Sequence, residues 1–195
     1  MAVRVLAALL TVLLCWPHPA PSASLDVALA DVTQAKATGG MIALFPRPED
    51  AAALAVPGGE PAEDLHLTLV DFGPDVTGRT DDELIRRVSE VVTRWATEVK
   101  AQAFGHATFS PGTPSECEVY LIGDAPELAD LRDALVEVAA QVYPLPAQHD
   151  PWIPHVTARY GMSDTVLSRT GPVVFDRVGL RWGEQATDFP LQPAL

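Results

Sequence analysis

Two tetrapeptides of the same pattern lie far apart in the sequence, His66-Leu67-Thr68-Leu69 and His155-Val156-Thr157-Ala158. In a β-strand successive side chains point to opposite faces, so the histidine and the threonine of each tetrapeptide share one face. The apolar residues of each copy take the other face, which can be buried. Each copy therefore offers a titratable group beside a neutral hydrogen-bond donor.

The histidines and threonines of this pattern have the chemistry needed for proton transfer and anion binding. Imidazole has an ordinary pKa near 6.5, so at neutral pH one histidine can accept a proton while the other donates one. The two threonine hydroxyls can bind the non-bridging oxygens of a phosphate held between the copies. We therefore predict His66 and His155 as catalytic residues and Thr68 and Thr157 as phosphate-binding residues. Which histidine is the acid stays open.

The paired motifs resemble the 2H phosphoesterase superfamily, which includes 2'-5' RNA ligase-like proteins and cyclic phosphodiesterases. The resemblance includes Thr38–Phe45, which looks like that family's first strand, and Gly58–Pro61 and Pro151–Pro154, which lead into the motifs. It covers the chain from about Thr38 to the C-terminus. It implies a bilobal α+β fold with pseudo-two-fold symmetry, in which antiparallel sheets line a central cleft and helices lie outside. It also implies catalysis without a metal or another cofactor.

A third match to the motif, His106-Ala107-Thr108, also occurs. Short motifs recur by chance, and the family pattern requires one motif in each half of the chain. Residues 66 and 155 satisfy that requirement. We therefore interpret the segment around His106 as a supporting strand and His106 as a surface residue or one that supports the site.

Three residues near the second motif are possible substrate contacts. Arg159 alternates onto the same face as His155, so it can reach a phosphate oxygen, with a surface salt bridge as the alternative. Trp152 can stack on a base or can serve the Pro-Trp-Ile-Pro turn. Tyr160 faces the other way if the strand stays regular, whereas a bend at Gly161 would turn it toward the mouth of the cleft.

Other chemistries lack their sequence signals. The sequence contains no phosphate-binding Gly-x-x-x-x-Gly-Lys, no Gly-x-Ser-x-Gly elbow and no Cys-x-x-Cys pair. A zinc site at His66 and His155 would need a third ligand, and no carboxylate or cysteine lies at the expected spacing. Cys117 lies between two glutamates, which raise the pKa of a thiol, so we interpret it as an ordinary strand residue.

The N-terminus predicts export. Residues 1–23 contain a short charged start, an uncharged apolar run at residues 5–16 and small residues before a plausible cleavage site. The apolar run is shorter than the ~20 residues that cross a bilayer as a helix, so we predict a secretory signal and no membrane span. Residues 24–37 are then a linker or a loose first helix, and residues 38–195 form the phosphoesterase-like domain. The alternative is a cytoplasmic protein whose translation starts downstream, for instance at Met41.

The chain is strongly acidic, with a formal net charge of −13. Removal of residues 1–23 takes away one arginine and no acid, which changes that charge to −14. Extended nucleic-acid binding depends on Lys and Arg side chains that neutralise several phosphates. We therefore expect a small nucleotide or a short RNA end as substrate rather than a long nucleic acid, unless the cleft is locally basic. No pattern indicates a protein partner.

The hydrophobic periodicity predicts alternating strands and helices that fit two similar lobes. A capping box at Thr80–Glu83 begins a long helix, whose apolar stripe is followed as far as Val99. Another helix begins near Pro126. Strands are expected at the second motif and at about residues 41–45, 65–72, 102–109, 118–122, 173–175 and 178–182. A short helix is expected at residues 49–56.

Together these features predict a metal-independent phosphodiesterase that hydrolyses a 2',3'-cyclic phosphate or a 2'-5' linked nucleotide or RNA end. The reverse reaction, 2'-5' ligation, uses the same groups. An alternative is a secreted nucleotide- or phosphate-binding protein with the same fold and little turnover. The presence of all four motif residues, which binding alone would not require, favours the enzyme.

Overall fold

A computed structural model describes residues 38–76, 82–95, 97–161 and 166–193 of the 195-residue chain. The expected signal peptide at residues 1–23, the linker at 24–37 and the capping residue Thr80 lie outside the described residues. Within the described part, no helix is long and apolar enough to cross a bilayer.

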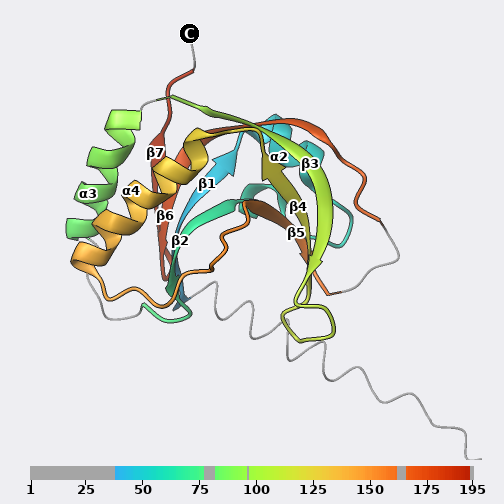
Figure 1. The fold of residues 1–195 in the computed structure, drawn as a ribbon, viewed down its shortest axis with the longest axis horizontal. Coiled ribbons are helices and arrows are strands. Elements are labelled where there is room, and N and C mark those ends of the chain that lie inside the picture. The colour runs from blue at the N-terminus through green and yellow to red at the C-terminus, as the bar shows by residue number, and fades with distance from the viewer. Residues whose placement is uncertain (1–37, 77–81, 96, 162–165, 194–195) are drawn as a thin grey trace, which may run out of the picture.

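The strands form one antiparallel sheet in the order β2-β1-β6-β3-β4-β5, with β7 paired to β6 (Figure 1). Their bounds are β1 (Gly40–Pro46), β2 (Leu67–Gly73), β3 (Val99–Phe109), β4 (Cys117–Gly123), β5 (His155–Tyr160), β6 (Gly171–Trp182) and β7 (Gln185–Pro190).

The order of the strands is the same from both edges of the sheet: first the motif strand (β2 or β5), then a strand of seven residues (β1 or β4), then a long strand (β6 or β3). The two long strands, β6 and β3, pair only through Gly171–Phe175 and Val99–Ala103. Beyond that contact β6 continues beside β1, and β3 continues beside β4. This arrangement confirms the bilobal α+β fold, with the two halves hydrogen-bonded into one continuous sheet.

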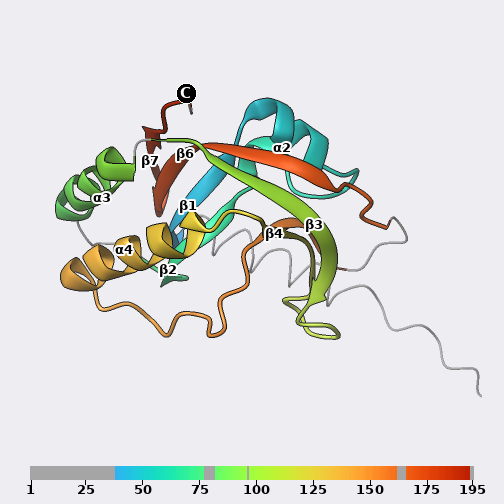
Figure 2. The same ribbon diagram turned by 45° about the horizontal axis from the view of Figure 1, so that its top comes forward.

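Among the described residues, three helices cover the sheet: α2 (Pro48–Leu54), α3 (Asp82–Trp95) and α4 (Glu127–Val142). A 3-10 turn, η1 (Ala62–Asp64), precedes the first motif. The helices α3 and α4 lie side by side at one end of the molecule, and α2 lies apart from them (Figures 1 and 2). Each long helix buries a stripe at helical spacing, because one apolar side must face the core. The buried stripes are Leu84, Val88, Val91 and Val92 in α3, and Leu128, Leu131, Leu135 and Ala139 in α4.

Two expectations about the elements are wrong. Val99, expected on the long helix, begins β3 and pairs with Phe175. Residues 171–182 form one strand rather than two, because the polar pair Asp176-Arg177 contains an irregularity in the pairing with β1, at Asp176, rather than a turn. The strand β7 was not expected, since its residues mix polar and apolar side chains and are mostly exposed. A two-residue turn at Gly183-Glu184 folds it back onto β6, with φ of 58° at the glycine.

Candidate active site

The two motif strands lie at opposite ends of the strand order, yet the curved sheet brings them into contact. The indole Nε1 of Trp152 donates a hydrogen bond to the carbonyl of Thr68 at 3.3 Å. The amide of Glu60 donates to the carbonyl of Ala158 at 2.8 Å. This approach requires glycine at position 59, where a Cβ would lie 2.4 Å from the same carbonyl oxygen. Gly59, before the first motif, therefore permits the close contact between the two halves beside the site.

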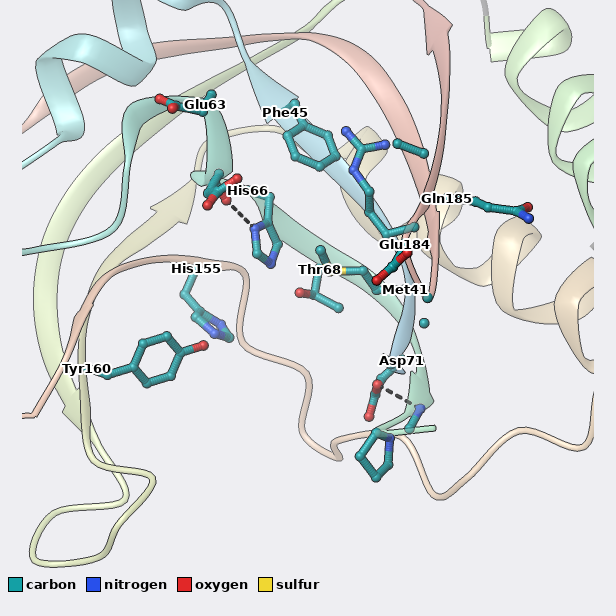
Figure 3. A pocket seen from close by; sticks show the side chains of 18 of the residues that line it. Met41, Phe45, Glu63, His66, Thr68, Asp71, His155, Tyr160, Glu184 and Gln185 are labelled. Atoms are coloured by element: carbon teal, nitrogen blue, oxygen red, sulfur yellow. Dashed lines mark hydrogen bonds between the residues drawn. The ribbon is translucent and has the colours of Figure 1, made fainter. Parts of the chain in front are cut away.

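His66 and His155 line one cavity of about 600 Å³, and Figure 3 shows their rings turned toward one another across it. Both motifs alternate as expected, with the histidines and threonines half-buried. The apolar residues on the opposite side are 1% exposed or less: Leu65, Leu67, Leu69, Val156 and Ala158. Burial of these residues fixes which face of each strand the histidine occupies.

The two histidines are held in the same way. The Nδ1 atom of His66 lies 2.6 Å from the carbonyl oxygen of Asp64, and that of His155 lies 2.7 Å from the carbonyl oxygen of Ile153. A carbonyl can only accept, so Nδ1 carries the proton in each neutral ring and Nε2 carries the lone pair. Nε2 is therefore the atom of each ring that can exchange a proton with a substrate.

Aromatic neighbours fix the planes of both imidazoles. The ring of Phe45 lies 5.8 Å from that of His66, and the ring of Phe109 lies 4.8 Å from that of His155 in an edge-to-face arrangement. Such pairs prefer tilted or edge-on geometry and resist rotation of the ring. Each imidazole is therefore held by a backbone carbonyl and by an aromatic side chain.

Burial lowers the pKa of His155, although the hydrogen bond to the Ile153 carbonyl opposes that effect. The nearby His149, which also lines the cavity, lowers the pKa further. A lowered pKa favours the neutral imidazole, which can accept a proton. His149 was given no role from the sequence, because nothing there indicates that its proline-rich loop returns to the site.

The two threonines of the motifs lie in different surroundings. Thr68 lines the cavity beside His66 (Figure 3). Thr157 is not one of the described residues that line the cavity. Burial raises the pKa of the Cys117 thiol, and a hydrogen bond with the Thr157 side chain partly offsets that effect. The structure therefore brings His66, Thr68 and His155 together, whereas Thr157 contacts the neighbouring strand.

The expectation that Arg159 faces the cavity is wrong. In the pairing of β5 with β4, Thr157 lies opposite Val119 and Arg159 opposite Glu118, which leaves Ala158 as an extra residue. This bulge breaks the alternation, so Ala158 and Arg159 are both buried. Arg159 is 2% exposed and forms an ion pair with Glu118.

The same bulge turns Tyr160 into the cavity, where Figure 3 shows it beside His155. Burial, followed by the charges of Glu60 and Cys117, raises the pKa of Tyr160 to about 12. Its hydroxyl therefore stays protonated at neutral pH and can donate a hydrogen bond. The strand does bend away directly afterwards, at Gly161 with φ of 76°.

The other two sequence candidates lie outside the cavity lining of the described chain. Trp152 is half-buried against the core, bonds to Thr68 as described, and has the guanidinium of Arg132 5.0 Å from its ring centre. The structure thus favours the turn-forming alternative for Trp152 over base stacking. His106 lies on β3, with its Nε2 2.9 Å from the carbonyl of Arg169, as expected of a supporting strand.

Sequence reasoning missed Arg181 and several acids of the cavity. Arg181 comes from β6, a strand that the motifs do not mark. The carboxylates that line the cavity are Glu63, Asp64, Asp71 and Glu184. Across the described residues, no group of three or more histidine, cysteine, aspartate or glutamate side chains is arranged to hold a metal ion.

Fold and site together define a protein with two facing histidines in a bilobal sheet. The family model of the 2'-5' RNA ligase superfamily matches residues 49–178, and the chain belongs to that superfamily. Its fold is similar to that of TT0787 of Thermus thermophilus, with 21% identity, a TM-score of 0.53 and coverage of 79% of this chain and 95% of that one. It is also similar to LigT of E. coli in complex with 3'-AMP, with 19% identity, a TM-score of 0.50 and coverage of 80% and 95%. No curated protein matches the sequence.

Proposed function

We propose that the protein is a metal-independent phosphodiesterase that hydrolyses 2',3'-cyclic phosphates or 2'-5' linkages of nucleotides or RNA ends. One observation carries the proposal: His66 and His155 face one cavity with the same tautomer, each fixed by a carbonyl two residues earlier. Membership of the 2'-5' RNA ligase superfamily supports phosphodiesterase or ligase chemistry in general.

In the hydrolytic direction, neutral His155 accepts a proton from water through Nε2, and the water oxygen attacks phosphorus. The bond from phosphorus to the ribose oxygen breaks, and protonated His66 gives its Nε2 proton to that oxygen. The lowered pKa of His155 supports its role as the base. Ligation is the reverse sequence with the same groups.

Neutral donors are suited to the oxygens on which charge builds up in the transition state. The hydroxyls of Thr68 and Tyr160 both line the cavity and can donate to non-bridging phosphate oxygens. Tyr160 thus offers, on the His155 side, the donor that the sequence assigned to Thr157. The role of Thr157 stays a prediction.

A small substrate fits both the cavity and the charge of the protein. A volume of about 600 Å³ lies within the range of small-molecule sites. The net charge of −13 disfavours a long phosphate backbone. The LigT structure with bound 3'-AMP supports a nucleotide as the class of ligand. We further propose that residues 1–23 direct export, which the N-terminal sequence of the protein recovered from outside the cell would test.

The test uses protein lacking residues 1–23, with EDTA present, and the substrates 2',3'-cyclic AMP and a 2'-5' linked dinucleotide. His66→Ala and His155→Ala should each lower kcat/KM by ~10²-fold or more, the usual loss for a general acid or base. His106→Ala is the matched control, because this histidine also precedes a threonine by two residues but lies outside the cavity lining, and its activity should be unchanged.

Two results would contradict the proposal. Loss of turnover on addition of EDTA would contradict metal independence. A wild-type protein that binds these nucleotides without turning any of them over would favour the nucleotide-binding alternative instead.

A further inference from the structure

Arg181 is fixed at the wall of the cavity by two side chains. Its Nη1 donates to Oδ1 of Asp188 at 2.7 Å and to the carbonyl of Leu180 at 3.3 Å. Its guanidinium lies 4.2 Å from the centre of the Phe45 ring. Glycine at position 179 makes room for this stack, because a Cβ there would lie 2.5 Å from Phe45 and 2.7 Å from Nη1 of Arg181.

The remaining donors of Arg181 are available to a ligand. Its Nε and Nη2 atoms make no hydrogen bond within the described part of the chain, and the residue lines the cavity. A guanidinium has five N–H donors in a planar fork that matches the oxygens of a phosphate. Donors held in place on a cavity wall lose little entropy when they bind such a group.

An anionic phosphate in the cavity would be stabilised by a cationic side chain. Among the described residues that line the cavity, Arg181 is the only lysine or arginine. The lining also contains four carboxylate side chains, whose negative charge repels an anionic substrate. Arg159, the expected cation, is buried against Glu118. Phe45 contacts both Arg181 and His66, so the guanidinium lies on the His66 side of the site.

We propose that Arg181 binds the phosphate group of the substrate through Nε and Nη2, in the role that the sequence suggested for Arg159. The inference rests on the proposed function for the identity of the substrate, but phosphate binding itself can be measured without turnover.

Arg177 provides a matched control on the same strand. Its guanidinium lies 5.0 Å from the centre of the same Phe45 ring, and its Nε lies 3.5 Å from the same Asp188 carboxylate. It does not belong to the described lining of the cavity. Arg177→Gln therefore removes an equivalent stack and ion pair without removing a donor from the cavity.

The experiment compares wild type, Arg181→Gln, Arg181→Lys and Arg177→Gln in kcat/KM for 2',3'-cyclic AMP and in affinity for inorganic phosphate by calorimetry. Arg181→Gln should weaken phosphate binding and kcat/KM by ~10- to 100-fold, the range for losing a charged hydrogen bond. Arg181→Lys should recover part of the loss, because it keeps the charge but not the fork. Arg177→Gln should stay within about threefold of wild type in both measurements, as a residue with no substrate contact.

Equal losses in Arg181→Gln and Arg177→Gln would overturn the proposal, because the effect would then come from the Phe45 stack. If no phosphodiester is turned over by wild type, the proposed function fails, and the phosphate affinities alone decide the role of Arg181. Thermal unfolding checks that the variants fold. If Arg181→Gln does not fold, Arg181→Lys replaces it, and wild-type phosphate affinity in that variant would contradict the proposal.

Discussion

The tautomers of His66 and His155 are set by backbone carbonyls rather than by carboxylates. A carboxylate beside Nδ1 would stabilise the imidazolium and raise its pKa, whereas a neutral carbonyl does so less strongly. Because the hydrogen-bond partners are backbone carbonyls, the charge state of each ring depends mainly on its burial and on the other charged groups around it. At His155 those surroundings are apolar burial and a second imidazole, and both favour the neutral ring.

The acid limb of the pH–rate profile should report His155. If neutral His155 is the base, kcat/KM falls as the pH drops through its pKa, which burial places below the ordinary value of 6.5. His149→Gln removes the neighbouring imidazole that lowers the pKa of His155, so the acid limb should move to higher pH. His106→Gln should leave the limb in place. An acid limb at or above pH 6.5 in wild type would contradict the assignment of the base.

The two motif threonines should not be equivalent in activity. Thr68 lines the cavity, whereas Thr157 bonds to Cys117. We expect Thr68→Val to lower kcat/KM by ~10²-fold, as for loss of one oxyanion donor. Thr157→Val should lower kcat/KM by less than about tenfold, which is a smaller loss than that expected for a residue that donates directly to the transition state. Equal losses, measured on 2',3'-cyclic AMP, would show that Thr157 also reaches the phosphate.

The bulge in β5 gives the two residues that follow it opposite roles, with Arg159 in the interior and Tyr160 in the cavity. Arg159→Met should leave the largely buried carboxylate of Glu118 without its ion-pair partner. Removal of one partner of a buried pair costs about 3 kcal/mol or more in the free energy of unfolding. Urea denaturation measures this loss, and kcat/KM of the folded variant should change little.

The double variant Arg159→Met with Glu118→Gln is the control for that experiment, because it removes both charges. It should recover much of the lost stability, since two neutral side chains can replace a buried pair at little cost. A stable Arg159→Met single variant with greatly reduced activity would instead restore the role in substrate binding that the sequence suggested.

Local patterns in the sequence predicted the elements that keep a regular period of buried side chains along their whole length. The alternation at His66–Leu69 and the helical stripe from Leu84 to Val92 each depend on near neighbours in the chain, and the structure confirms both. The orientation of Arg159 depends instead on the register of β5 against β4, where a single extra residue reverses the face. Nothing in the tetrapeptide indicates that shift.

The position of Arg181 could not be predicted for a related reason. It lies on β6, which the sequence suggested as two short strands, and its side chain is held by Asp188 of an unexpected strand. Only the pairing of β6 with β1 brings it beside Phe45 and the first motif. The position of a cationic residue on a strand without a motif therefore depends on how the whole sheet pairs, which the local sequence does not indicate.

At the scale of the molecule, the near-symmetry of the sheet explains why one site contains two equivalent histidines. The outer strands β2 and β5 occupy matching positions in the two halves, and the curvature that brings them together forms the cavity between them. The surroundings are less symmetric. Arg181 lies on the His66 side, because Phe45 contacts both residues, whereas Figure 3 shows Tyr160 beside His155. This difference can assign distinct acid and base roles to two similar motifs.

The charge of the whole chain gives a prediction about substrate length. A protein of net charge −13 repels an RNA of about 20 nucleotides that ends in a 2',3'-cyclic phosphate, and salt screens that repulsion. From 0.01 to 0.15 M salt the Debye length falls from about 30 to about 8 Å. The kcat/KM for the long RNA should therefore rise with salt, by up to ~10-fold, while that for 2',3'-cyclic AMP changes far less. A decrease with salt for the long RNA, as when a protein releases counterions from phosphates, would instead indicate a basic surface that tracks the RNA backbone.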